Sequence, residues 1–210
     1  ADGEDMTRLE YRRGQARDLA IHRRGNPSTL GPVVRRRFLE VLSPGKIQPF
    51  RKGSGRLELA DALVDPRRGG SLTARVIVNR IWRGHFGRGL VTTPSNFGLQ
   101  GDTPSHPGLL DDLAARFIDN DWSLKWLHRE LVLSATYRQS SLASPRGDAV
   151  DPANRWLWRM NRRRLSIESW RDAMLTASGE LDTALGGVAI PVNDPGHRRR
   201  TLYSKIERRE

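Results

Sequence analysis

Apolar residues recur along most of this chain at the three- and four-residue spacing of amphipathic helices. The first such segment begins at Arg56 and ends before Asp65-Pro66, because the residue before a proline avoids the helical backbone region. The second runs to Phe86 and ends at Gly87, and we expect Ser71 to be its N-cap. It carries the longest apolar set, so we predict that it is the central helix of the core.

A helix of this length is not stable alone in water, so its apolar face must be buried. The face predicted to be buried consists of Val76, Ile77, Ile81 and Trp82. The residues predicted to pack against it are Leu110, Leu113, Phe117, Leu127 and Leu131.

Three further helices have clear start signals. Pro107 suits the first turn of one helix, and Ser123 and Ser166 are the expected N-caps of two others. Gly179 is the expected end of the last helix. A short basic helix is predicted over residues 155–161.

The remaining segments are expected to be irregular. Residues 1–55 read as non-helical, with a short strand over 17–22, and a second strand is expected over 200–203. Residues 87–104 and 140–152 are loops rich in glycine, proline and serine. We expect the 87–104 loop to be ordered over one end of the helices, because a loop of this length in a compact domain is usually functional or disordered. The apolar residues expected to anchor it are Phe97 and Leu99.

Together these patterns predict a mainly α fold, with a single helical bundle-like core, extended irregular arms and at most a short β element. The expected divisions are an N-terminal arm over 1–55, a core over 56–180 and a truncated C-terminal segment over 181–210. The chain begins without an initiator Met and ends in a charged run, so we expect more sequence on both sides. No apolar run approaches the roughly 20 residues that cross a bilayer, and the first residues lack a signal peptide's apolar region.

The formal net charge of +12 comes almost wholly from arginine. The only lysines are Lys46, Lys52, Lys125 and Lys205. An anionic partner would explain this charge, because guanidinium groups bind phosphate and sulfate in pairs of hydrogen bonds. We favour the alternative, a compositional bias toward arginine whose charge neighbouring domains balance. The absence of cysteine excludes disulfides, thiol nucleophiles and Cys-type metal sites.

A long motif crosses the expected central helix and the loop after it. The runs LTARVIVNRIW at 72–82, HFGRGLV at 85–91 and TPSNFG at 93–98 resemble the signature of a domain of unknown function abundant in planctomycetes. Further matching segments are 104–107, 109–111, 122–125, 127–129, 134–141, 154–155, 158–159, 162–165, 171–173, 186–187 and Glu168. The resemblance covers the chain from about Ala16 to its end.

This resemblance implies a context and no activity. Proteins with such a domain are typically large and exported, and the domain follows another uncharacterised domain and often a cytochrome-c-like module. The family domain usually extends beyond the position of Glu210. We therefore expect a periplasmic or extracellular location and neighbouring domains of the same polypeptide as partners. No cofactor is expected in this chain.

Four side chains are candidates for catalysis. His85 and Arg88 surround a glycine turn, where they either bind and polarise an anionic group or satisfy the last carbonyls of a helix. His106, between two prolines, either joins His85 or packs at a helix entrance. Glu168 either does acid/base work with Asp172 or forms ion pairs with nearby arginines.

The candidate ligand-binding residues are Asn79, Arg88, Asn96 and His106, and we expect any site where the 87–104 loop meets them. No spacing of His, Asp and Glu indicates a metal site. Trp156 is either a packed residue or an exposed ring that stacks a sugar or a base with its neighbours Arg155 and Arg159.

Three functions stay open. The first is a non-catalytic structural or interaction module of a larger exported protein. The second is a hydrolase or binding domain for an anionic, sulfated polysaccharide, and the third is a basic docking surface for an acidic partner or redox domain. Nucleic acid is disfavoured, because no helix-turn-helix spacing fits.

Overall fold

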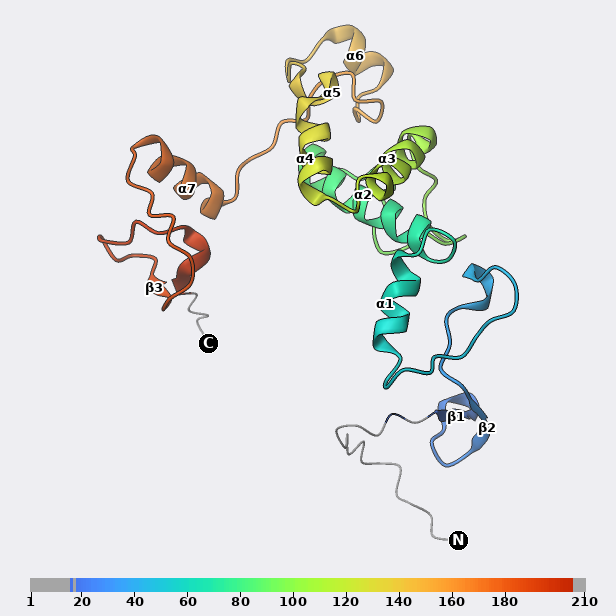
Figure 1. The fold of residues 1–210 in the computed structure, drawn as a ribbon. Helices are drawn as coiled ribbons and strands as arrows, with labels where there is room; N and C mark the ends of the chain where they lie inside the picture. Colours follow the sequence, from blue (N-terminus) through green and yellow to red (C-terminus); the bar gives the residue numbers. More distant parts are fainter. Residues whose placement is uncertain (1–15, 17, 206–210) are drawn as a thin grey trace. The chain divides into compact units, whose positions relative to one another are not determined.

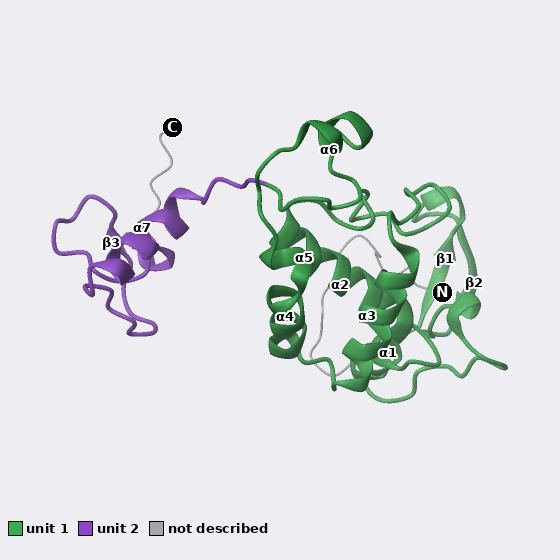
Figure 2. Cartoon of the chain, turned by 90° about the horizontal axis from the view of Figure 1, so that it is seen from above, with its two compact units in different colours: residues 1–161 green, residues 162–210 purple. Residues whose placement is uncertain are grey.

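The computed structural model describes residue 16 and residues 18–205, in two compact units. The first unit spans residues 1–161 and the second residues 162–210 (Figure 2). The described residues contain seven α-helices and two small two-stranded sheets (Figure 1), which confirms the predicted mainly α class. The start of the N-terminal arm and Arg17 of its predicted strand lie outside the described residues.

The first unit opens with a small antiparallel hairpin. Strand β1, Leu19–His22, pairs with β2, Leu30–Val34, in a register that places Leu19 opposite Val34. The strand predicted over 17–22 is therefore confirmed over Leu19–His22, and Asp18 precedes it. A 3-10 turn over Arg23–Gly25 joins the two strands, with Arg24 in the left-handed backbone region.

Six helices follow the hairpin in the first unit. They are α1 (Arg56–Val64), α2 (Gly70–Phe86), α3 (Pro107–Asp119), α4 (Leu124–Leu133), α5 (Ala135–Arg138) and α6 (Pro145–Val150). Pro107 occupies the first turn of α3, and the Ser123 hydroxyl accepts the Trp126 N–H at the start of α4, both as predicted. Gly87 ends α2 in the left-handed conformation, with φ of 83°.

The predicted start of α2 was wrong. The helix begins one residue before Ser71, at Gly70, and its N-cap is Gly69, which makes no side-chain capping bond. Gly70 donates its N–H to the Asp65 carbonyl at 2.8 Å, and a Cβ at Gly70 would lie 2.7 Å from that same carbonyl. Contact with the end of α1 therefore fixes where α2 begins.

The buried face of α2 also differs from the prediction. Ala74, Val78, Trp82 and Phe86 are the buried apolar residues, whereas Val76, Ile77 and Ile81 are only partly buried. A four-residue spacing that begins with small side chains allows α3 and α4 to approach α2 closely. The predicted partners in α3 and α4 all lie in this core, as a set: Leu110, Leu113, Phe117, Leu127 and Leu131.

Residues 87–104 form an irregular segment that continues the core. Leu90 and Val91 are buried, and Phe97 packs against the core, but Leu99 is fully exposed. Leu99 is therefore not the anchor that its apolar character suggested, and Leu90 and Val91 anchor the segment instead.

The segment after α4 was partly misread. Residues 155–161 form turns rather than the predicted basic helix, and the predicted loop over 140–152 contains helix α6. The turns arise because polar side chains bind the backbone there, with Asn154 and Leu157 in the left-handed region. A Cβ at Gly147 of α6 would lie 2.6 Å from the Trp158 ring, so helix and turns approach very closely.

The second unit contains α7, Ile167–Ala177, followed by an irregular tail. The Ser166 hydroxyl accepts the Ser169 N–H, as expected of an N-cap. Strands β3 (Ile190–Pro191) and β4 (Ser204–Lys205) pair in parallel. The strand expected over 200–203 is instead a 3-10 turn, Thr201–Tyr203, because the Asp172 carboxylate of α7 accepts both the N–H and the hydroxyl of Thr201.

Candidate functional site: a two-arginine cavity

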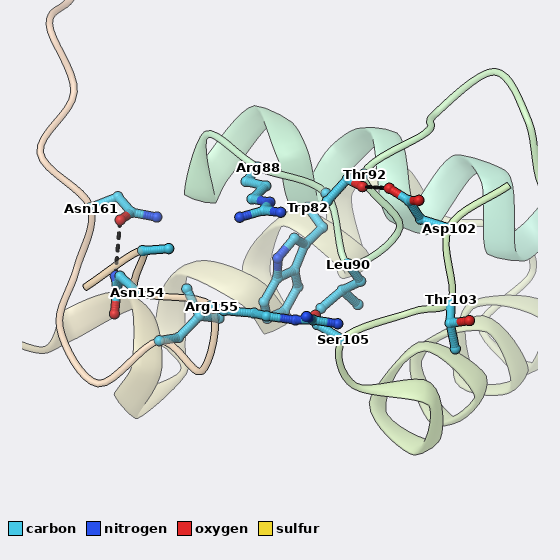
Figure 3. Close-up of a pocket in the computed structure, with 13 residues that line it drawn as sticks. Trp82, Arg88, Leu90, Thr92, Asp102, Thr103, Ser105, Asn154, Arg155 and Asn161 are labelled. Atoms are coloured by element: carbon cyan, nitrogen blue, oxygen red, sulfur yellow. Dashed lines mark hydrogen bonds between the residues drawn. The ribbon is translucent and has the colours of Figure 1, made fainter. Parts of the chain in front are cut away.

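The first unit contains a cavity of about 320 Å³ where three segments meet (Figure 3). Its walls come from the end of α2, from the irregular segment 88–105 and from the turns at 153–161. The lining residues are Trp82, Arg88, Gly89, Leu90, Thr92, Asp102, Thr103, Ser105, Ala153, Asn154, Arg155, Leu157 and Asn161. This volume is at the small end of the range for ligand pockets.

Asn79 of α2 holds the first wall in place. Its amide donates to the Val91 carbonyl at 3.0 Å and accepts the Val91 N–H at 2.9 Å, and its side chain is 0% exposed. A Cβ at Gly89 would lie 2.5 Å from the Val91 carbonyl oxygen and 2.8 Å from the Asn79 amide oxygen. The close approach of the chain to Asn79 therefore requires glycine at position 89.

Asp151 and Asn154 hold the second wall. The Asp151 carboxylate accepts the backbone N–H of Arg155 at 2.9 Å and of Trp156 at 2.7 Å. The Trp156 N–H is the main cause that lowers the pKa of the Asp151 carboxyl, and desolvation opposes it. Asn154, with φ of 49°, donates to the Arg159 carbonyl at 2.8 Å and to the Asn161 side chain at 2.9 Å.

Asn161 connects this second wall to the central helix. Its amide donates to the Phe86 carbonyl at 2.9 Å, at the last residue of α2. That carbonyl has no N–H donor within the helix, so the bond also satisfies an end group of α2. The cavity is thus built on rigid contacts at both walls.

Two guanidinium side chains and one carboxylate line this cavity. Figure 3 shows Arg88 and Arg155 beside the Trp82 indole, and Asp102 hydrogen-bonded to Thr92. Among residues 16 and 18–205, neither Arg88 nor Arg155 forms an ion pair with a carboxylate. Guanidinium groups that form no ion pair are suited to bind a carboxylate, sulfate or phosphate of a ligand.

Of the residues that the sequence singled out, Arg88 lines the cavity. Asn79 is buried behind it and positions the wall. His106 lies beside it, because its Nδ1 is 2.9 Å from the hydroxyl of the lining residue Ser105. Asn96 is exposed on the same irregular segment, where its side-chain oxygen accepts the Gly98 N–H at 3.0 Å.

His85 and Glu168 have other surroundings. His85 Nε2 is 2.7 Å from Nδ1 of His128 on α4, and its ring meets Tyr137 edge to face. Glu168 is in the first turn of α7 in the second unit, where its own backbone N–H and then the Ser166 hydroxyl lower its pKa. Neither residue lines the two-arginine cavity.

A family model described as a protein of unknown function, PSD1 (DUF1553), matches residues 55–210. The match covers most of the chain, including both walls of the cavity. The chain belongs to the PSD1 family. No curated protein and no solved structure matches it.

Several residues that line the cavity were not predicted from the sequence. Arg155 was considered only as a neighbour of Trp156, and Asp102, Asn154 and Asn161 were not considered as site residues. The sequence around them gives little indication of a site, because the Asp, Asn and Pro residues at 151–154 indicate turns but not what those turns enclose.

Two further observations concern metal binding and membrane crossing. Within the described ranges, no three His, Cys, Asp or Glu residues lie close enough together to hold a metal ion. None of the described helices has the length and apolar character that crossing a membrane requires.

Proposed function

We propose that this chain is a non-catalytic binding module, and that the two-arginine cavity takes up an anionic group of its ligand. The observation that carries the proposal is the pair Arg88 and Arg155, which line one cavity and form no ion pair among the described residues, although the Arg155 charge acts on the Asp151 carboxylate. An anionic group of a ligand would supply a closer partner for both guanidinium groups.

The positions of the candidate acid and base residues favour binding over hydrolysis. A hydrolase would need His85, Arg88 and His106 to converge with Asn79, Asn96 or Glu168 in one cleft. Of these residues only Arg88 lines the cavity, and His85 pairs with His128 instead. We therefore favour a binding role over hydrolysis.

We further propose that the module belongs to a larger, exported multidomain protein and packs against neighbouring domains of the same polypeptide. Exposed apolar side chains support this role, because an isolated domain rarely carries many of them together. On α7 of the second unit they are Ile167, Trp170 and Met174. On α1 of the first unit they are Leu57, Leu59, Leu63 and Val64. An acidic partner that docks through the arginine-rich surface is the remaining alternative.

The anion-binding proposal is tested by NMR of the arginine side chains. We expect that sodium glucuronate and sodium sulfate, titrated separately, shift the Nε–H signals of Arg88 and Arg155 and saturate. The other arginines of the chain serve as internal controls, because a nonspecific ionic effect would move all exposed guanidinium signals together.

Variants distinguish binding in the cavity from a general effect of the positive charge. Arg88→Ala should abolish the saturable shift of the Arg155 signal, and Arg155→Ala that of the Arg88 signal, whereas Arg67→Ala with Arg80→Ala removes charge from exposed positions outside the cavity lining and should leave both shifts unchanged. Saturable shifts that survive in both single variants, or no saturable shift in the unmodified chain, would contradict the proposal.

A further inference from the structure

The tryptophan next to the cavity is exposed. Trp156 is 60% exposed, whereas Trp82, which lines the cavity, is 5% exposed. Trp156 directly follows Arg155, whose guanidinium lies 5.9 Å from the centre of its ring. An exposed ring beside a charged cavity offers a flat apolar face on which a ring of a ligand can stack.

The backbone that carries Trp156 is fixed before any ligand arrives. The Trp156 N–H donates to Asp151, and the residues on either side of the Arg155-Trp156 pair have left-handed backbones, with φ of 49° at Asn154 and 56° at Leu157. Leu157 also packs against the core. A ring on such a backbone loses little conformational freedom when a ligand stacks on it.

His106 links this ring to the cavity. Its imidazole meets the Trp156 indole nearly edge to face, with ring centres 5.4 Å apart and an angle of 77°. On its other side, the His106 Nδ1 is 2.9 Å from the hydroxyl of Ser105, which lines the cavity. His106 is therefore a positioning residue, which connects the indole to a residue of the cavity lining.

The polar groups of the cavity suit a sugar better than a nucleic acid. Hydroxyl groups of a sugar both donate and accept, so they match the Asp102 carboxylate and the Ser105 hydroxyl together. A phosphodiester only accepts and leaves Asp102 without a donor, whereas an acidic sugar can donate a hydroxyl to Asp102 and place its anionic group at the arginines. The two guanidinium groups then require that one sugar carries a negative charge.

The size of the cavity limits what enters it. About 320 Å³ holds one sugar ring with its charged substituent, and a second ring must lie outside. Trp156 is outside the lining but follows the lining residue Arg155 and contacts His106, the neighbour of the lining residue Ser105. We propose that the module binds an acidic oligosaccharide, with one charged ring in the cavity and the adjoining ring stacked on Trp156. This rests on the proposed anion-binding function.

The test compares ligands of increasing length by calorimetry on the full chain. The probes are glucuronate, galacturonate oligomers of two to four rings, and sulfated oligosaccharides of matching length. We expect the longer ligands to bind at least about tenfold more tightly than the single ring, a gain that corresponds to about 1.4 kcal/mol. The uronate and sulfate series identify which acidic group the cavity prefers.

Two tryptophan variants test whether Trp156 causes the gain in affinity with ligand length. Trp156→Ala should remove the gain in affinity with length, and Trp156→Phe should restore part of it. Trp170→Ala is the matched control, because Trp170 is 51% exposed on α7 and should not matter. His106→Ala should reduce the gain less than Trp156→Ala, since it loosens the ring without removing it.

The outcomes separate the two proposals. If glucuronate binds at Arg88 and Arg155 but length brings no gain, or the gain survives Trp156→Ala, the stacking proposal is wrong and anion binding stands. If glucuronate does not bind there, the proposed function itself fails. A single-stranded oligonucleotide that binds more tightly than every oligosaccharide, and does so through Trp156, would overturn the assignment to a glycan.

Discussion

At the scale of single residues, Asn79 shows how a polar side chain in an apolar core can position a site. Both hydrogen bonds of its amide go to the backbone of Val91, twelve residues later and without secondary structure around it. Buried backbone groups must be paired, and no strand or helix pairs those of Val91. Asn79 thus supplies the backbone hydrogen bonds that a neighbouring strand would supply in a sheet.

We predict that Asn79→Ala lowers the free energy of unfolding by roughly 2–4 kcal/mol, because it leaves two buried backbone groups of Val91 without partners. Urea unfolding measures this change. Asn96→Ala is the control: its side chain is exposed and bonds only within a local turn, so the expected loss is below about 1 kcal/mol. Equal losses in the two variants would show that the Val91 bonds do not stabilise the fold.

Residue types alone predicted one residue of the cavity lining, Arg88. The other lining residues could not be predicted for a physical reason. Arg88 was predicted because a glycine turn after a helix is a local feature of the sequence. Arg155 was not, because its position depends on Asp151, Asn154 and a bond from Asn161 to Phe86, 75 residues earlier in the chain. Periodicity and capping rules carry no information about such distant bonds.

At the scale of the elements, helix starts were predictable where a serine bonds its own helix. Ser123 and Ser166 each accept a backbone N–H three residues later, which is a local rule. The Ser71 hydroxyl instead lies 3.4 Å from the Pro66 carbonyl, because contact between α1 and α2 had already set the start of α2. The failed prediction came from tertiary packing that the local sequence does not encode.

The two serines give a matched test of this difference. Ser123→Ala should lower the free energy of unfolding by about 1 kcal/mol, because the Trp126 N–H loses its acceptor. Ser71→Ala should change it by less than about 0.5 kcal/mol, since that residue is exposed and caps nothing. Thermal or urea unfolding of both variants decides the point, and a larger loss for Ser71→Ala would restore it as the cap of α2.

At the scale of the whole molecule, each compact unit has its own means of stability. The first is built on the apolar core of α2, α3 and α4. In the second, α7 has no buried residue, and hydrogen bonds join it to the tail. Arg171 donates to the carbonyls of His197 and Arg199, while Asp172 accepts from Thr201. A unit that depends on polar contacts should respond to pH more than one with an apolar core.

His197 makes that expectation specific. It is 1% exposed, its Nε2 is 2.9 Å from the Ser204 hydroxyl, and desolvation, with the Arg171 charge next, lowers its pKa. The unfolded chain, with a pKa near 6.5, therefore takes up the proton first as the pH falls. The stabilisation is complete above about pH 6.5 and decreases as the pH falls toward the folded-state pKa.

We expect the second unit to unfold at a lower urea concentration at pH 5.5 than at pH 7.5, measured through the indole NMR signal of Trp170. His197→Gln should reduce this difference, because it removes the titrating group. His22→Gln, at an exposed position of the hairpin, should leave it unchanged. A pH response of His197→Gln equal to that of the unmodified chain would assign the effect to other groups.

The division after Asn161 falls inside the PSD1 match, which continues from residue 55 to residue 210. The match therefore crosses from one compact unit into the next. Every residue that lines the cavity lies at or before Asn161, so a fragment that ends there keeps the whole lining and lacks α7 and the tail. Ligand titration of such a fragment would show whether the cavity acts without the second unit.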